Sequence, residues 1–199
     1  EARALGARTL ITAGAFQSNH CRQTAAAAAK FGMECILVLT GEQPHLPTGN
    51  FLLDKLLGAH IVVLPDRGKR DACLQETFDT AAAQGKAPYL VPYGGSSPIG
   101  ALGYAFAMQE VLEQGVNVDW MIFATSSGGT QAGLVLGQRL FGYQGKVLGI
   151  SIDASKPWLS KHVAVLASDA SEKLVARIPF SPAAVLVNDH YCRPGYGVL

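Results

Sequence analysis

The sequence has little charge and little imbalance of charge. Only 16% of its 199 residues are charged, against roughly 25% in ordinary soluble domains. The net charge is +1, so the chain lacks the basic excess that marks nucleic-acid-binding proteins. No apolar run reaches the roughly 18 residues that a membrane-spanning helix requires. We therefore expect neither a nucleic-acid partner nor a membrane partner.

Cysteine is also scarce, and its spacing excludes the common uses of this residue. The four cysteines form no CxxC pair and fit neither a disulfide framework nor a zinc site. No two histidines are spaced to share one helix face. We expect reduced thiols in a cytoplasmic protein and no metal site. The residues concerned are Cys21, Cys35, Cys73 and Cys192, and His20, His45, His60, His162 and His190.

The chain is instead rich in apolar residues (49%) and glycine (22 residues), and apolar runs alternate with helical stretches. This alternation is typical of parallel sheets covered on both faces. We predict an α/β fold with three-layer open parallel sheets and helices on both faces. The run 119–125 is the most apolar, and we expect it to be the most buried strand. The predicted strands are 7–13, 34–40, 60–65, 87–93, 119–125, 146–152 and 184–191, and the predicted helices are 20–32, 49–59, 70–84, 99–114, 129–141 and 157–171.

A polar stretch near 112–118 is the expected domain boundary, which gives domains of residues 1–112 and 113–199. The chain starts at Glu1 with a segment that reads as the last turns of a helix, and it ends on a turn. We therefore expect a fragment of a larger protein, with the second domain incomplete.

Polar side chains gather in the turn after the first predicted strand. Gln17, Ser18, Asn19 and His20 are consecutive, and Ser18 or Asn19 can cap the following helix. One cap needs only one such side chain. Four of them at the carboxyl end of a parallel strand favour a ligand site, because open α/β sheets bind ligands there.

Two later strand-to-helix turns, 93–100 and 126–130, are rich in glycine and serine. Backbone N–H groups at the start of a helix attract phosphate, although neither GxxxxGK[ST] nor GxGxxG is present. Both turns are also compatible with a tight turn or a hinge that binds nothing. Asp153 and Asp189 lie near strand ends, and helix capping explains them as well as function does.

Taken together, the three turns resemble the D-cysteine desulfhydrase / 1-aminocyclopropane-1-carboxylate (ACC) deaminase family. This family belongs to the fold type II pyridoxal-phosphate enzymes, like the tryptophan synthase β subunit. The resemblance implies pyridoxal 5'-phosphate as cofactor, a small amino acid as substrate and a homodimer. The matching segments are TAGAFQSNHCRQTAAAAAKFG, GNFLLDKLLGA, PYGGSSPIGALGY, SSGGTQAGL and RPGYGV.

The resemblance also implies roles for matched positions. Ser18 and Tyr196 would be catalytic, and Asn19 would bond the ring hydroxyl of the cofactor. Ser18, Asn19 and His20 would bind the substrate, with contacts to its carboxylate. Residues 1–112 would form the small domain, and 113–199 part of the large domain, with the cofactor between them. The phosphate would lie on Ser126, Ser127, Gly128, Gly129 and Thr130, where the family commonly has Gly in place of Ser126.

One residue that the resemblance requires is missing. Pyridoxal-phosphate enzymes hold their cofactor as a Schiff base on a lysine, which this family carries upstream of the Ser-Asn element, and no lysine here matches that position. We expect the fragment alone to be inactive and the full-length protein to be a lyase or deaminase. D-Cysteine desulfhydrase is favoured over ACC deaminase, because the deaminases more often have Gln where this chain has His20. A non-catalytic phosphate-ligand-binding protein of the same fold and an unrelated flavin-binding, flavodoxin-like module remain alternatives.

Overall fold

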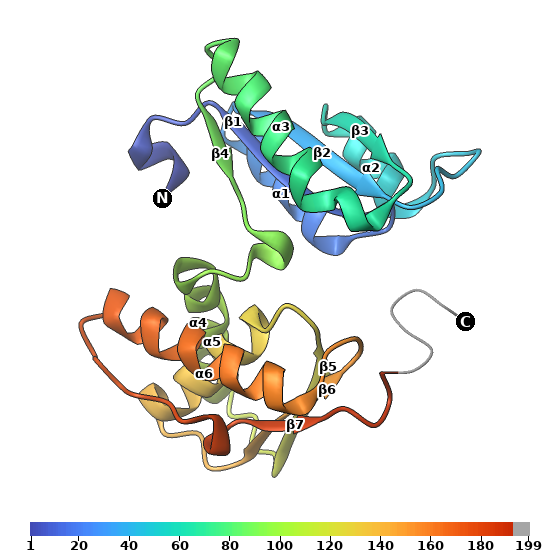
Figure 1. Cartoon of the computed structure of the whole chain (residues 1–199). Helices are drawn as coiled ribbons and strands as arrows, with labels where there is room; N and C mark the ends of the chain where they lie inside the picture. Colours follow the sequence, from blue (N-terminus) through green and yellow to red (C-terminus); the bar gives the residue numbers. More distant parts are fainter. Residues whose placement is uncertain (193–199) are drawn as a thin grey trace. The chain divides into compact units, whose positions relative to one another are not determined.

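A computed structural model describes residues 1–192 of the chain. The chain divides into two compact units, Glu1–Gly94 and Gly95–Leu199 (Figure 1). The expected boundary at residue 112 falls inside helix α4 (Pro98–Glu113), which packs on α5 and α6 of the second unit. The chain therefore passes from one unit to the next at Gly94, about one helix earlier than the polar stretch indicates.

The first unit is built on a parallel sheet with the strand order β3-β2-β1-β4. Every predicted strand and helix of this part of the chain is present, with ends shifted by a few residues. The strands are β1 (Thr9–Ala15), β2 (Glu34–Thr40), β3 (His60–Leu64) and β4 (Pro88–Leu90), and the helices are α1 (Asn19–Lys30), α2 (Gly49–Leu56) and α3 (Arg70–Ala83).

Successive residues of β1 face opposite sides of this sheet, as in any strand. Leu10 belongs to a core shared with α1 and α2, whereas Ile11 belongs to a core shared with α3. Both residues are buried. The sheet therefore has helices on both faces, which confirms the predicted three-layer arrangement for this unit (Figure 1).

The second unit contains a parallel sheet with the order β5-β6-β7 and a core formed with three helices. Among the described residues, no helix of either unit is long and apolar enough to cross a membrane. The second unit's strands are β5 (Trp120–Thr125), β6 (Lys146–Ser151) and β7 (Leu186–Asn188), and its helices are α4, α5 (Gly129–Phe141) and α6 (Lys156–Lys173).

Strand β5 is not the most buried strand, so that prediction was wrong. Trp120 and Ile122 are 46% and 59% exposed, although Met121 and Phe123 between them pack against the helical core. Within residues 1–192, β5 lies at the edge of its sheet. Its apolar composition correctly predicted a strand, but the described helices cover only one of its faces.

Candidate functional site

The turn after β1 is held by the cap of α1. Ser18 is the N-cap, and its Oγ accepts a hydrogen bond from the Cys21 N–H at 3.2 Å. A Cβ at Gly14 would lie 2.8 Å from Ser18 Oγ and 2.6 Å from Cys21 Sγ, so only glycine permits this close approach. A hydroxyl accepts and donates at the same time, and Ser18 also forms a side-chain hydrogen bond with the Cys21 thiol.

A residue that sequence reasoning did not single out, Asn50 of α2, fastens this turn. Its Nδ2 donates to the Gln17 carbonyl and to Asn19 Oδ1, both at 2.9 Å. Gln17 Oε1 in turn accepts from the Asn50 N–H at 2.9 Å, and Gln17 Nε2 donates to the Thr48 carbonyl at 3.1 Å. The start of α2 therefore fixes the conformation of the turn that carries Ser18 and Asn19.

These bonds also determine which way the Asn19 amide presents its groups. The Gln17 carbonyl only accepts, so the Asn50 atom that faces it must be the amide nitrogen. The second hydrogen of that nitrogen goes to Asn19 Oδ1. Asn19 is exposed, and its NH2 group remains as a donor to a hydroxyl or phenolate oxygen.

His20 is held on the other side of the turn by Thr12 of β1. His20 Nε2 lies 2.7 Å from Thr12 Oγ1, and Thr12 Oγ1 donates to the Val91 carbonyl at 2.9 Å. Burial lowers the pKa of His20 to about 4, because the charged ring would lose its hydration. The imidazole is therefore neutral at pH 7.

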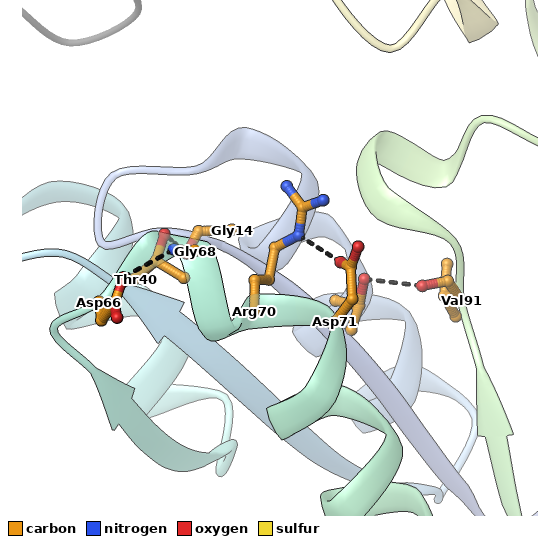
Figure 2. Close-up of polar contacts among 8 residues, drawn as sticks. Gly14, Thr40, Asp66, Gly68, Arg70, Asp71 and Val91 are labelled. Carbon is orange, nitrogen blue, oxygen red and sulfur yellow. Dashed lines mark hydrogen bonds and ion pairs between the residues drawn. The ribbon is translucent and has the colours of Figure 1, made fainter.

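The other polar contacts in Figure 2 hold the backbone at the carboxyl ends of the strands. Thr40 Oγ1 donates to the Gly14 carbonyl at 3.3 Å, which ties the end of β2 to β1. Asp66, after β3, accepts from the Gly68 N–H at 2.9 Å. Arg70 pairs with the largely exposed Asp71 at 2.8 Å. The Thr40 and Asp66 bonds fix the backbone at this edge of the sheet, whereas the Arg70–Asp71 pair is a surface contact at the start of α3.

The second turn leads directly from β5 into α5. Gly128 is the N-cap of α5 and has the left-handed φ of +80°. A Cβ there would lie 3.1 Å from side-chain atoms of both His162 and Val163, so the packing adds to the preference for glycine that the positive φ sets. The N–H groups of the first turn of a helix have no partner within the helix, and they favour an anion.

Ser96, from the third turn, lies against this helix start. Its Oγ accepts from the Gly129 N–H at 3.0 Å and donates to Ser127 Oγ at 2.7 Å. The second and third turns, which are separate in the sequence, therefore meet at one place. The hydroxyl caps α5 from a position that is distant in sequence, in the absence of a capping side chain at Gly128.

Glycines on α5 explain how the third turn reaches this position. Gly129, Gly133 and Gly137 recur every four residues, so they share one face of the helix. A Cβ at Gly133 would collide with the Ala101 carbonyl of α4, and one at Gly137 would lie 2.6 Å from the Ala105 carbonyl. The backbones of α4 and α5 are thus in contact, so the start of α4 lies next to the start of α5.

The two aspartates that the sequence left undecided have different partners. Asp189 Oδ2 accepts from the Lys156 N–H at 2.7 Å at the first turn of α6, so capping accounts for it. Asp153 Oδ2 accepts from Ser126 Oγ at 2.6 Å. The Ser126 hydroxyl, in the position where the family commonly has glycine, is therefore engaged with a carboxylate. Thr130 lies half-buried in the first turn of α5.

The remaining candidates are placed as follows. Cys21 and Cys35 are buried, Cys73 and Cys192 are half-buried, and all four are free. Among residues 1–192, no cluster of three His, Cys, Asp or Glu side chains could hold a metal. Tyr196, the second expected catalytic residue, lies outside the described residues. The Ser18 turn belongs to the first unit and the 126–130 turn to the second.

A profile of the family described as "Pyridoxal-phosphate dependent enzyme" matches residues 1–198. The chain belongs to the pyridoxal-phosphate-dependent enzyme family. Its cofactor class is thus pyridoxal phosphate, which excludes the flavin-binding, flavodoxin-like alternative.

Solved structures of this family give the fold. An ACC deaminase homologue is 34% identical, with a TM-score of 0.86 over 99% of this chain and 60% of its own. Two more distant structures share the fold alone. A threonine deaminase from T.th. is 20% identical, with a TM-score of 0.61, and the match covers 78% of this chain and 47% of that protein. Maize serine racemase is 17% identical, with a TM-score of 0.59, and the match covers 96% of this chain and 54% of that protein. The expected tryptophan synthase β-like architecture is confirmed. The chain spans about 60% of the length of the ACC deaminase homologue.

Proposed function

We propose that the protein to which this chain belongs is a pyridoxal-phosphate-dependent lyase or deaminase that acts on a small amino acid. We further propose D-cysteine desulfhydrase as its activity, converting D-cysteine to pyruvate, sulfide and ammonia. The proposed cofactor binding rests on the Asn50–Asn19 hydrogen bond. This bond leaves the Asn19 NH2 group as a donor, at the position where the family bonds the ring hydroxyl of the cofactor. The alternative activity is ACC deaminase, which the 34% identical homologue supports.

The start of α5 fits the phosphate of the cofactor. The Gly129 N–H is capped by Ser96, so it would bind the phosphate only if this cap opened. The other N–H groups of the first turn, next to a glycine with φ of +80°, would bind the phosphate together with Ser127 and Thr130. Ser126 would add little, because Asp153 already accepts its proton. When bound, pyridoxal phosphate supplies an electron sink that stabilises negative charge at the α-carbon of an amino acid.

The residues of the Ser18 turn would hold the ring and the substrate. Asn19 would donate to the ring oxygen, and the Ser18 hydroxyl would donate to the substrate carboxylate or carry a proton during the reaction. Ser18 and Asn19 are kept in place by the α1 cap and by Asn50. We propose Tyr196 as a second catalytic residue on the resemblance alone.

No lysine of the chain matches the position that holds the cofactor covalently in this family. Lys30 and Lys55 lie over the rings of Phe31 and Phe51, and Lys86 pairs with Glu34 at 3.3 Å. These contacts are those of surface lysines. We therefore propose that the chain alone binds the cofactor without turnover. On the resemblance and the unpaired cysteines, we also propose that the whole protein is a cytoplasmic homodimer.

The test is product formation by the whole protein loaded with pyridoxal phosphate. We expect sulfide and pyruvate from D-cysteine at a rate well above that from L-cysteine, and little 2-oxoacid from ACC. Ser18→Ala is expected to lower turnover sharply while the cofactor stays bound. Release of 2-oxoacid from ACC in preference to D-cysteine would favour the deaminase. A protein that binds the cofactor and converts neither compound would instead be the non-catalytic binding protein of the same fold.

A further inference from the structure

The Thr12 hydroxyl determines which nitrogen of His20 carries the proton. A hydroxyl has one proton to donate, and Thr12 Oγ1 lies 2.9 Å from the Val91 carbonyl, which can only accept. The Thr12 proton is therefore committed to Val91. Thr12 is completely buried, so water does not compete for it.

His20 Nε2 lies 2.7 Å from the same oxygen. Since the Thr12 proton points at Val91, this short contact is a hydrogen bond only if Nε2 carries a proton and donates it. The opposite assignment, with Nδ1 protonated, would turn the Thr12 proton to Nε2 and leave two oxygen lone pairs facing each other at 2.9 Å. In a neutral imidazole with Nε2 protonated, Nδ1 holds a lone pair and only accepts.

We propose that Thr12 and the Val91 carbonyl hold neutral His20 with its proton on Nε2, so that Nδ1 accepts a hydrogen bond from a donor on the substrate side chain, such as the thiol of cysteine. The substrate part of this inference rests on the proposed function, and the tautomer does not. Thr12 is then a positioning residue for His20. A nitrogen lone pair repels a carboxylate, so His20 takes a different role from the carboxylate contact that the resemblance implies.

This assignment also bears on the choice between the two substrates. D-Cysteine has a side-chain S–H that can donate, whereas the ring carbons of ACC carry no such donor. An acceptor at position 20 therefore distinguishes the two compounds by the side chain, while the carboxylate, which both share, is left to Ser18 and Asn19.

The tautomer is tested by nitrogen NMR of the chain with 15N-labelled histidine, in which the His20 signals are identified by their loss in His20→Gln. We expect a protonated Nε2, whose proton is protected from solvent exchange, and an unprotonated Nδ1. Thr12→Val keeps the shape and removes the hydroxyl, and should lower that protection at least tenfold, whereas Thr12→Ser should retain it. The control Thr24→Val removes a bond to the His20 backbone carbonyl and should leave the ring proton unchanged. A proton on Nδ1, or equal protection in Thr12→Val, would overturn the assignment.

The acceptor role is tested on the same labelled chain with two small acids that differ only in the thiol. Titration with 3-mercaptopropionate at millimolar concentration should move the Nδ1 signal, and propionate should leave it in place. A response to both acids indicates a carboxylate contact, and a response to neither indicates no contact. Either result overturns the substrate part while the tautomer stands. Turnover of D-cysteine by the whole protein, measured separately, shows whether the proposed function itself fails.

Discussion

Asp54 gives the sharpest prediction about the first unit. It lies on α2, is completely buried, and neither of its carboxylate oxygens has a hydrogen-bond partner within the described part of the chain. Burial raises its pKa from 3.8 to about 6, although the charge of Arg22 lowers it in part. A buried carboxyl without partners favours its neutral form, because the charged form loses its hydration.

The direction of the pH effect follows from this raised pKa. As the pH rises above 3.8, the carboxyl ionises in the unfolded chain but stays protonated in the folded chain until about pH 6. The folded state therefore binds more protons, and its stability falls with pH across this window. One pKa unit corresponds to 1.36 kcal/mol, so a shift of about two units costs about 3 kcal/mol once the pH exceeds 6.

The assay is amide hydrogen exchange of the first-unit core in α1 and β2, measured as a free energy of opening from pH 4 to pH 8. Both tryptophans lie in the second unit, so their fluorescence in urea reports that unit separately. Asp54→Asn should remove the part of this loss that falls between pH 4 and pH 6, about 2 kcal/mol. Asp71→Asn, which changes a carboxylate whose side chain is 83% exposed, should keep the wild-type profile. Parallel profiles for wild type and Asp54→Asn would refute the reasoning.

Three further substitutions test the contacts around the turns. Ser96→Ala should make exchange of the Gly129 amide roughly fivefold faster, since a lost helix cap costs about 1 kcal/mol. Asn50→Ala should weaken the binding of pyridoxine 5'-phosphate, measured by calorimetry, about fivefold, the value of one ordinary hydrogen bond of about 1 kcal/mol. Gly133→Val should destabilise the second unit by about 1–3 kcal/mol, measured by urea unfolding with tryptophan fluorescence. The control Gly103→Ala should leave the stability unchanged, because a Cβ there would meet nothing within 4 Å.

The sequence predicted the elements well because each depends on local pattern. Apolar runs and capping residues placed every strand and helix to within a few residues, and Ser18 proved to be the cap that its position indicates. The exposure of Ile122 was not predictable in this way. Whether an apolar strand is covered depends on segments distant in sequence, and the hydrophobicity of the strand does not indicate where those segments lie.

The same limit applies to the site. Ser18, Asn19 and His20 could be identified from their density in one turn, but the partner that orients Asn19 is Asn50, 31 residues away. Asn50 stands in a matching segment, GNFLLDKLLGA, yet nothing local marks it as a partner of Asn19. Tertiary packing likewise brought Ser96 to the start of α5.

Binding of the cofactor phosphate at the start of α5 can be measured by one calorimetric comparison. Pyridoxine 5'-phosphate and pyridoxine, which differ only in the phosphate, are titrated into the chain and into two variants at opposite ends of α5. Gly128→Ala and Gly142→Ala replace glycines with φ of +80° and +75°, so the backbone strain is similar, and only the Cβ at Gly128 also meets a neighbour, at 3.1 Å. We expect Gly128→Ala to weaken binding of the phosphate compound at least tenfold and Gly142→Ala to retain it. Equal affinities in the two variants, or no preference of the wild-type chain for the phosphate compound, would contradict phosphate binding at the start of α5.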